Sequence, residues 1–358
     1  MELLILPGDG IGPEITATVI SCLEALDRRF SLNLQLQVEE VGLARLQKHG
    51  VTMPVGLLER AKAVDGIILG PLSTASYPPA AEGGINISRE FRQKLDLFAN
   101  IRPAIGRPGI SKYAPNMDLI IVRENTEGFL ADRNMLFGCG EFMPTEDIAL
   151  AVRKISASAS KRIAEAAFKL ALQRKKKVTV VHKANSLKLS DGLFLREVRR
   201  VASSYEDIEL NEVFVDAMAA MLIRNPERFD VVLTTNLFGD ILSDEAAEIS
   251  GSLGLAASLN EGVDLAVAQA AHGSAPDISG LDRANPTGLM LSTAMLLEWI
   301  GNKQNNQNML KAALCFHSSV EHVLSNPHTV TVDLGGNLGT ANYGRLVVES
   351  IEAGTEAR

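Results

Sequence analysis

The sequence predicts an α/β fold built on a mostly parallel sheet. Short apolar runs alternate with longer amphipathic stretches, which is typical of strands and helices following one another. The chain has 358 residues, of which 46% are hydrophobic and 22% charged, as in ordinary globular proteins. At roughly 100–200 residues per domain, this length predicts about two domains, which need not be contiguous in sequence.

Eight apolar runs are expected to form buried strands. They are residues 3–6, 34–38, 66–69, 119–122, 178–181, 213–215, 231–234 and 330–332. The stretches between them have hydrophobic residues at a spacing nearer to about 3.6 than to 2, which predicts helices. These include residues 148–174, 193–203, 240–250 and 289–299.

Residues 133–144, RNMLFGCGEFMP, interrupt this alternation with glycine, methionine and phenylalanine. We interpret the segment as an arm that packs on a partner chain. A partly buried internal loop is an equally good interpretation of the sequence.

Charge and cysteine content exclude several classes of protein. The net charge of −8 and the pI of about 5.4 disfavour nucleic-acid binding. The three cysteines form neither a metal-binding pattern nor a disulfide framework, which fits a reducing compartment. No secretory signal or membrane-spanning run is evident, so we expect a cytoplasmic protein.

The opening segment LLILPGDGIGPE places a strand, a glycine-rich turn and a helix in succession, as dinucleotide-binding motifs do. In those motifs a third glycine lets the helix pack closely on the strand, but Pro13 occupies that position. We therefore interpret the segment as a tight turn with positive φ angles, or as a loop near an anionic ligand, and not as a dinucleotide fingerprint.

Asp240 and Asp244 lie four residues apart at the start of a predicted helix, so they share one helix face. Like charges at this spacing repel each other unless a cation lies between them. A few hard oxygen ligands suit Mg²⁺ or Mn²⁺. The alternative is a solvated acidic first turn favoured by the helix dipole.

Four arginines and one lysine are candidates for binding and catalysis. Arg89, Arg92, Arg102 and Arg123 could clamp carboxylates in bidentate fashion, although any one alone could be a surface residue. Lys183 follows the predicted strand 178–181, where active-site residues collect, and could act as a base. Together with a carboxylate-bound metal, these residues predict a polyanionic substrate.

Residues 270–288 form a long loop rich in glycine, proline, serine and asparagine, and loops of this length are usually functional. His272 and Gly273 could cradle a phosphate or contact an adenine. Asp277 could accept a hydrogen bond from a ribose hydroxyl. A purely structural loop remains the alternative.

Motifs along nearly the whole chain, in order, resemble the metal-dependent β-decarboxylating dehydrogenases that act on isocitrate, 3-isopropylmalate and homoisocitrate. The motifs are GDGIGPE (8–14), FANIRP (98–103), VRENTEG (122–128), HKAN (182–185), VDAMA (215–219), FDVVLTTNLFGDILSDEA (229–246), GSLGL (251–255), HGSAPDI with ANPT (272–287) and DLGG (333–336).

This resemblance implies a two-domain, non-Rossmann α/β fold in which NAD lies against the loop 270–288. A large, NAD-binding domain would comprise residues 1–98 and 251–358, and a small domain residues 99–250. It also implies a homodimer with shared active sites, in which the arm 133–144 forms a clasp.

The resemblance also implies roles for single residues. Asp240, Asp244 and the partner subunit's Asp216 would hold Mg²⁺ or Mn²⁺. Lys183, from the partner chain like Asp216, would take the hydroxyl proton as hydride leaves for NAD.

Binding residues are implied in the same way. Substrate contacts are expected from Ser88, Arg89, Arg92, Arg102, Arg123 and Asn185. NAD contacts are expected from His272, Gly273, Ser274, Ala275, Asp277 and Asn285. Asp277 matches the position that marks a preference for NAD over NADP.

One departure from the family pattern concerns the tyrosine that usually stands second after ENTEG and protonates the enol carbon. Here the pair is Phe129 and Leu130, so no hydroxyl remains. We hypothesise that hydride transfer survives while the last protonation slows, or that water or another group replaces the phenol. A noncatalytic regulatory paralogue is a second hypothesis.

The segment GGINISREFR, residues 83–92, corresponds to the loop that selects the substrate. Isopropylmalate enzymes usually carry leucines where this chain has Ser88 and Arg89. An arginine at the second position resembles homoisocitrate dehydrogenases, and Asn86-x-Ser88 inverts the Ser-x-Asn of isocitrate enzymes. We therefore predict a tricarboxylic substrate such as isocitrate or homoisocitrate, in preference to 3-isopropylmalate, D-malate or tartrate.

Overall fold

The computed structural model describes residues 1–130 and 140–354. The chain packs into two compact units. The first unit comprises Met1–Leu95, Pro108–Ile110 and Gly251–Arg358, and the second comprises Asp96–Arg107 and Ser111–Ser250. The first unit is therefore built from both ends of the chain.

The first unit contains five strands in the order β2-β1-β3-β12-β11. Their bounds are Glu2–Leu6 (β1), Gln35–Val38 (β2), Gly66–Leu69 (β3), Leu259–Glu261 (β11) and Ala266–Ala268 (β12). All neighbours are parallel except β11 and β12. The strands predicted at 3–6 and 66–69 are confirmed, and both are almost wholly buried.

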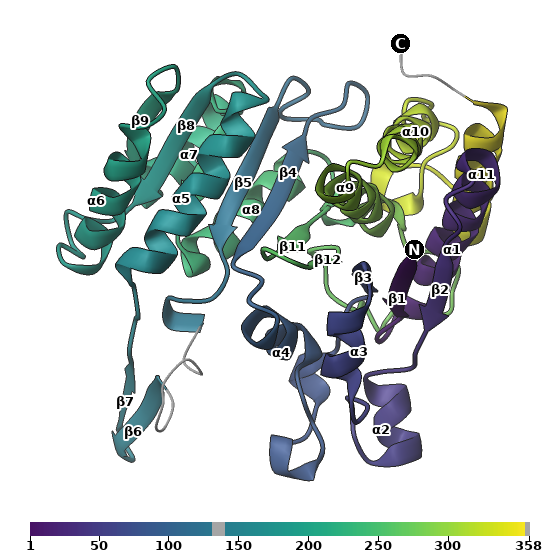
Figure 1. Cartoon of the computed structure of the whole chain (residues 1–358), viewed down its shortest axis with the longest axis horizontal. Helices are drawn as coiled ribbons and strands as arrows, with labels where there is room; N and C mark the ends of the chain where they lie inside the picture. Colours follow the sequence, from purple (N-terminus) through teal and green to yellow (C-terminus); the bar gives the residue numbers. More distant parts are fainter. Residues whose placement is uncertain (131–139, 355–358) are drawn as a thin grey trace. The chain divides into compact units, whose positions relative to one another are not determined.

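Along the chain, the helices of the first unit connect its strands or follow the last of them (Figure 1). They are α1 (Gly12–Phe30), α2 (Leu43–His49), α3 (Leu57–Ala63), α4 (Ile87–Lys94), α9 (Thr287–Gln304), α10 (Gln307–Leu324) and α11 (Thr340–Ala353). α9 packs on β3, β11 and β12 and is buried on nearly all sides, whereas α1 packs against α11. In residues 1–130 and 140–354, no helix combines the length and the apolar content that a bilayer crossing needs.

The main sheet of the second unit has five strands in the order β4-β5-β10-β8-β9, parallel except for β4. They are Ala99–Ile105 (β4), Asp118–Glu124 (β5), Lys177–His182 (β8), Glu209–Phe214 (β9) and Val231–Thr234 (β10). The helices are α5 (Ala157–Leu172), α6 (Ser190–Ala202), α7 (Val215–Arg224) and α8 (Asn236–Ile249). α5 and α6 cover one face of the sheet, and α7 and α8 the other (Figure 1).

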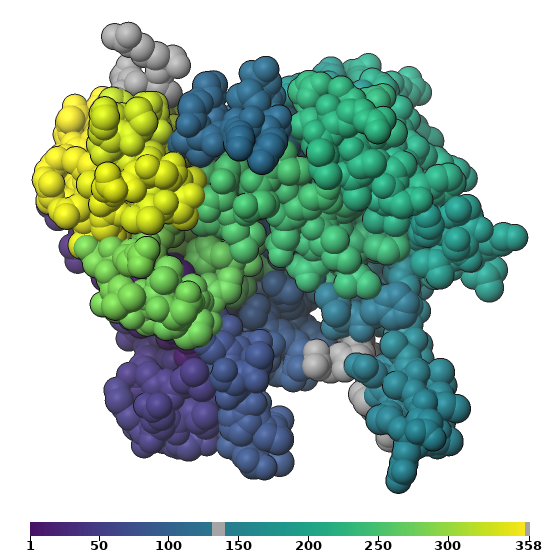
Figure 2. Space-filling model, turned by 180° about the vertical axis from the view of Figure 1, so that it is seen from behind, coloured from purple at the N-terminus to yellow at the C-terminus, as the bar shows by residue number. Residues whose placement is uncertain are grey.

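A hairpin of β6 (Glu141–Thr145) and β7 (Ile148–Ala151) stands apart from the sheet of the second unit (Figure 2). All residues of both strands are exposed, including Phe142, Met143 and Leu150. The predicted arm 133–144 falls partly here, while residues 133–139 lie outside the described residues.

Two predicted elements are wrong, and the strands predicted to be buried at 34–38 and 213–215 are exposed or half-buried in the structure. Residues 330–332 do not form a strand, because Asp333 accepts a hydrogen bond from Thr331 Oγ1 at 2.5 Å and the chain turns into a 3₁₀ helix at Val332–Leu334. The helix predicted from residue 148 begins only at Ala157, since Ile148–Ala151 pairs with β6.

The strand β4 was not predicted, because polar residues interrupt its apolar pattern. Asn100 and Arg102 are buried in it, so their side chains bond inside the unit instead of marking a solvent face.

Candidate active site

The second unit gathers its candidate side chains at one edge of the sheet. Arg123 lies near the end of β5, Lys183 follows β8, and Asp240 lies in α8, which follows β10. These three strands are parallel, so their carboxyl ends meet at the same edge. Ligand sites in open α/β sheets form at this edge.

Arg123 is held by the first turns of α8. Its side chain is 2% exposed, Nη2 donates to Asn236 Oδ1 at 2.7 Å, and Nη1 donates to Asp240 Oδ1. Gly239 makes room for it, because a Cβ there would lie 2.6 Å from Arg123 Cγ. Packing and hydrogen bonds therefore fix this guanidinium before any ligand binds.

Arg102 reaches the same helix from β4. Nε donates to Asn100 Oδ1 at 2.5 Å, and Nη1 donates to Ser243 Oγ at 2.6 Å and to Asp244 Oδ1 at 3.2 Å. Nη2 lies 3.4 Å from Asp240 Oδ1. Burial lowers the pKa of Arg102, and the two carboxylates partly offset that effect.

Asp240 and Asp244 fit a divalent cation by their chemistry. They are hard oxygen donors one helical turn apart, and their side chains are 40% and 51% exposed, so both carboxylates reach solvent. Burial raises the pKa of Asp244; Arg102 opposes this rise and Asp240 adds to it. A cation bound here would relieve the repulsion between the two carboxylates.

Lys183 and Asp216 form a separate pair. Lys183 Nζ lies 2.6 Å from Asp216 Oδ1 and 5.9 Å from the centre of the Phe214 ring. The hydrogen bond from Lys183 holds the pKa of Asp216 below its usual range. Within the described parts of one chain, no three acidic, histidine or cysteine side chains form a metal-binding group, so Asp216 does not join Asp240 and Asp244 there. Asn185 lies exposed in the turn after Lys183.

Phe129 and Leu130 are both half-exposed. The second unit has two tyrosines, and neither lies at the carboxyl edge of the sheet. Tyr113 precedes β5, and Tyr205 precedes β9 and packs on Phe168. Neither of these phenols therefore takes the place of the tyrosine that the family pattern puts at position 130.

The first unit carries the substrate-loop residues on α4. Asn86 caps this helix, because its Oδ1 accepts a hydrogen bond from the Arg89 backbone N–H at 3.0 Å. Ser88 Oγ donates to Gln269 Oε1 at 3.0 Å. Arg89 and Arg92 are three residues apart on the helix, which places them on one face.

The loop 270–288 is fixed at its centre and open at its edge. Ser274 is buried, its Oγ lies 2.8 Å from Ser73 Oγ, and Ala275 has a φ of +37°. Gly273 and Asp277 are exposed, and a Cβ at Gly273 would meet nothing within 4 Å. The exposed part is therefore accessible to a ligand.

His272 and Asn285 differ in how far their side chains are available to a cofactor. His272 Nε2 is buried without a hydrogen-bond partner in the described residues, and burial lowers the pKa of the ring. A buried ring nitrogen without a partner is costly unless a ligand satisfies it. Asn285 is committed to the fold, since its Oδ1 accepts from the Thr287 N–H and its Nδ2 donates to Asp333, both at 3.0 Å.

The opening glycines support the loop 270–288. Gly8 and Gly10 have positive φ, as the sequence predicts, and a Cβ at Gly10 would lie 1.9 Å from the Ser274 carbonyl oxygen. The Ile11 N–H donates to that same oxygen at 2.9 Å. The two loops therefore lie against each other.

Sequence reasoning missed Asp9, which stands between these glycines. Its carboxylate is buried and accepts from the Leu43 N–H at 2.6 Å, the Ser73 N–H at 2.9 Å and the Tyr77 hydroxyl at 2.6 Å. Burial, together with this acid, raises the pKa of Tyr77. All three partners lie more than 30 residues away along the chain, so no local pattern in the sequence indicated them.

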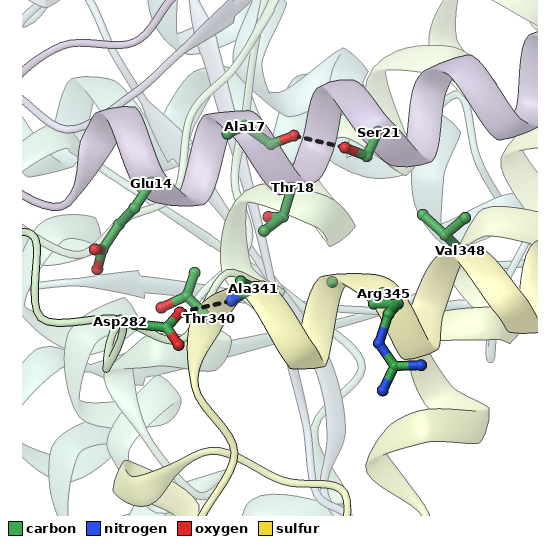
Figure 3. Close-up of a pocket in the computed structure, with 10 residues that line it drawn as sticks. Glu14, Ala17, Thr18, Ser21, Asp282, Thr340, Ala341, Arg345 and Val348 are labelled. Carbon is green, nitrogen blue, oxygen red and sulfur yellow. Dashed lines mark hydrogen bonds between the residues drawn. The ribbon is translucent and has the colours of Figure 1, made fainter.

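A pocket of about 450 Å³ lies between α1 and α11, with Glu14, Asp282 and Arg345 among its lining residues (Figure 3). Asp282 caps α11 by accepting from the Ala341 N–H at 2.8 Å. The pocket contains none of the residues predicted to bind substrate, metal or NAD.

Comparison with known proteins gives concordant matches. The family model described as isocitrate/isopropylmalate dehydrogenase matches residues 2–347. A 3-isopropylmalate dehydrogenase of Sulfurisphaera tokodaii is 38% identical, over 94% of this chain and 95% of that protein. A homoisocitrate dehydrogenase of Methanocaldococcus jannaschii is 38% identical, over 98% of each chain.

A solved structure of isocitrate dehydrogenase from Methylococcus capsulatus has a TM-score of 0.87 and 37% identity, and covers 98% of this chain and 99% of its own. This chain therefore shares the whole α/β fold of that structure.

Proposed function

Because the chain belongs to the isocitrate/isopropylmalate dehydrogenase family, we propose that it is an NAD-dependent enzyme that oxidises and decarboxylates a 2-hydroxy acid with Mg²⁺ or Mn²⁺. Enzymes of this family are decarboxylating dehydrogenases that generally use NAD(P) and a divalent metal. The observation that carries the proposal is the cluster in which Arg102 and Arg123 are buried against Asp240 and Asp244.

In the proposed mechanism, arginines bind the substrate carboxylates. Arg102 and Arg123 are already rigid, so they lose little conformational freedom when a carboxylate binds. Arg92, from α4, would be the third such group. Fixing the acid in this way determines which hydroxyl the base can reach.

Lys183 is the proposed base. It takes the proton of the substrate hydroxyl as hydride passes to NAD. In one chain its Nζ is paired with Asp216, so a partner chain that contributes one of these residues contributes both. We propose that they come from the partner subunit of a homodimer.

Asp240, Asp244 and the partner subunit's Asp216 would hold the divalent cation. When bound, Mg²⁺ or Mn²⁺ acts as a Lewis acid and stabilises negative charge on a substrate oxygen. The task of the chain is to present deprotonated carboxylates, and the flanking arginines favour that state of Asp244.

NAD would lie on the loop 270–288. The exposed Asp277 would accept from a ribose hydroxyl, and His272 has a ring nitrogen to offer. Gly273, Ser274, Ala275 and Asn285 would shape the same site. An acid at a ribose position disfavours a 2′-phosphate by repulsion, which supports NAD over NADP.

The proposed substrate is a tricarboxylate, isocitrate or homoisocitrate. Arg89 and Arg92 present two guanidinium groups on one face of α4, next to Ser88, which suits a third carboxylate better than an isopropyl group. Asn185 is proposed as a further contact.

Substitution of Arg89 tests the substrate assignment. In Arg89→Leu, we expect kcat/KM for the preferred tricarboxylate to fall about 10- to 100-fold, since a hydrogen bond to a charged group contributes roughly 1.5–3 kcal/mol. Activity on 3-isopropylmalate should fall less or rise. Lys94→Leu, an exposed change on the same helix, is the matched control. An unaltered ranking of substrates would show that Arg89 is not the selector.

Two alternatives have observations in their favour. Relatives named 3-isopropylmalate dehydrogenase favour that substrate, and D-malate or tartrate would fit the same arginines without Arg89. Leu130, which lacks a hydroxyl, favours a noncatalytic regulatory paralogue.

Assembly and location complete the proposal. The exposed apolar hairpin β6–β7 supports a clasp between two chains, because apolar strands without cover are normally buried by a partner. The three cysteines form no disulfide framework, which supports a reducing, cytoplasmic location; this stays a prediction.

The experiment that tests the function is NADH formation by the purified chain with NAD and Mg²⁺, on isocitrate, homoisocitrate, 3-isopropylmalate, D-malate and tartrate in parallel. We expect turnover of a tricarboxylate first. NADH formed by the chain alone would exclude an obligate regulatory role. Binding of NAD and metal without turnover of any substrate would contradict the enzyme proposal and point to Leu130.

A further inference from the structure

A buried ion pair lies behind Lys183. The side chains of Arg153 and Asp191 are only 7% and 0% exposed, and Arg153 Nη1 donates to Asp191 Oδ1. The other carboxylate oxygen, Oδ2, accepts from the backbone N–H of Lys183 at 2.6 Å. Asp191 therefore connects the guanidinium of Arg153 directly to the backbone of the proposed base.

Arg153 also reaches the loops that follow the neighbouring strands. Its Nη2 donates to Thr235 Oγ1 at 3.1 Å, immediately before α8, the helix that carries Asp240 and Asp244. Its guanidinium lies 5.4 Å from the centre of the Phe238 ring and 5.9 Å from that of Phe129, after β5. One side chain thus contacts the segments after β5, β8 and β10.

Arg153 is itself anchored by the backbone around it. It lies between β7 and α5. The carbonyl oxygen of the next residue, Lys154, accepts a hydrogen bond from the Gly128 N–H at 2.8 Å. Arg153 Nη1 also donates to Ser190 Oγ at 2.9 Å. A buried arginine with this many partners has one orientation available, so it can set the positions of the groups bound to it.

We propose that Arg153 and Asp191 are positioning residues that hold Lys183 and the start of α8 in register at the carboxyl edge of the sheet. The proposal rests on the function proposed above, since it takes Lys183 as the base. Neither residue needs to touch substrate. Their effect is on where Lys183 lies, and a small displacement of a reacting group lowers the rate without weakening ground-state binding.

The variants are Arg153→Met, Arg153→Lys and the double variant Arg153→Met with Asp191→Asn. In Arg153→Met we expect kcat to fall roughly 10- to 100-fold, with KM for substrate and NAD within about threefold of the parent. Arg153→Lys should have a kcat between those of Arg153→Met and the parent, because lysine keeps the positive charge but cannot make the bidentate hydrogen bonds of a guanidinium. Arg196→Met, an exposed arginine on α6, is the matched control and should behave as the parent.

Hydrogen exchange at the backbone gives a readout that needs no activity. Loss of the pair should speed amide exchange in residues 183–189 at least about tenfold, while α7 and α10 keep their protection. The double variant guards against simple unfolding, because replacing both buried charges avoids leaving one unpaired. It should remain folded and still exchange fast at residues 183–189.

The outcomes separate the two proposals. Unchanged exchange at residues 183–189 together with an unchanged kcat in Arg153→Met would overturn the positioning role. If the parent protein turned over no substrate, but Arg153→Met showed fast exchange confined to residues 183–189, the positioning role of the pair would be supported and the proposed function contradicted. A fall in kcat with KM raised in proportion would assign Arg153 to binding and also overturn the inference.

Discussion

Lys183→Met is expected to lower kcat by roughly 10²–10⁴-fold, the contribution of a positioned general base. The variant keeps the length of the side chain, which packs near the Phe214 ring, but removes the group that pairs with Asp216. The Asp216 side chain is 68% exposed, so loss of the pair should change stability little. Steady-state rates with saturating NAD, metal and substrate measure the effect.

Two control measurements show whether a fall in kcat is specific to Lys183. Lys188→Met, an exposed lysine in the same loop region, should retain the parental kcat. Thermal unfolding of both variants should match the parent within a few degrees. A Lys183→Met enzyme that retained even a tenth of the parental kcat would remove Lys183 from the mechanism.

Asp240→Asn is expected to lower kcat/KM by about 10³-fold and to weaken Mn²⁺ binding at least about 100-fold. The reason is that the bound metal ion would supply several kcal/mol of charge stabilisation, which is lost when a ligand is removed, and about 4 kcal/mol corresponds to 10³ in rate. Asparagine keeps an oxygen that can accept from Arg123, so the buried guanidinium is not left without a partner. Titration with Mn²⁺, followed by its paramagnetic signal, measures binding without catalysis.

Glu248→Gln removes one charge four residues beyond Asp244 on the same helix and is the matched control. Since burial raises the pKa of Asp244, protons compete with the cation at acidic pH, and Mn²⁺ affinity should rise with pH. Equal Mn²⁺ affinity in the parent and in Asp240→Asn would place the metal elsewhere.

Strands and helices were predicted correctly where the pattern of apolar residues within the element itself indicates its type. The buried strands at 3–6, 66–69 and 231–234 are continuous apolar runs, and the structure has them with almost those bounds. The short antiparallel strands β11 and β12, of three residues each, are too brief for any periodicity to show.

Site residues were predictable as residue types but not as partners. Spacing alone placed Asp240 and Asp244 on one helix face, yet nothing in the sequence showed that Arg102 would reach them from a strand lying far earlier in the chain. Gly239 and Asn236 were not predicted as site residues for a related reason: each matters only through its contact with Arg123. Such contacts arise from tertiary packing, which the local pattern of residues along the sequence does not predict.

The assembly of the first unit from both ends of the chain has a consequence for synthesis on the ribosome. β1 and β3 emerge first, but β12 and α9, which pack beside β3, follow only after residues 96–250 have been made. At roughly 5–20 residues per second, that delay is on the order of 10–30 s. The second unit, almost contiguous in sequence, can fold in that interval. During that interval the apolar strand Glu2–Leu6 lacks part of the packing of its unit, so we expect aggregation of the nascent chain to be a hazard at this stage of synthesis.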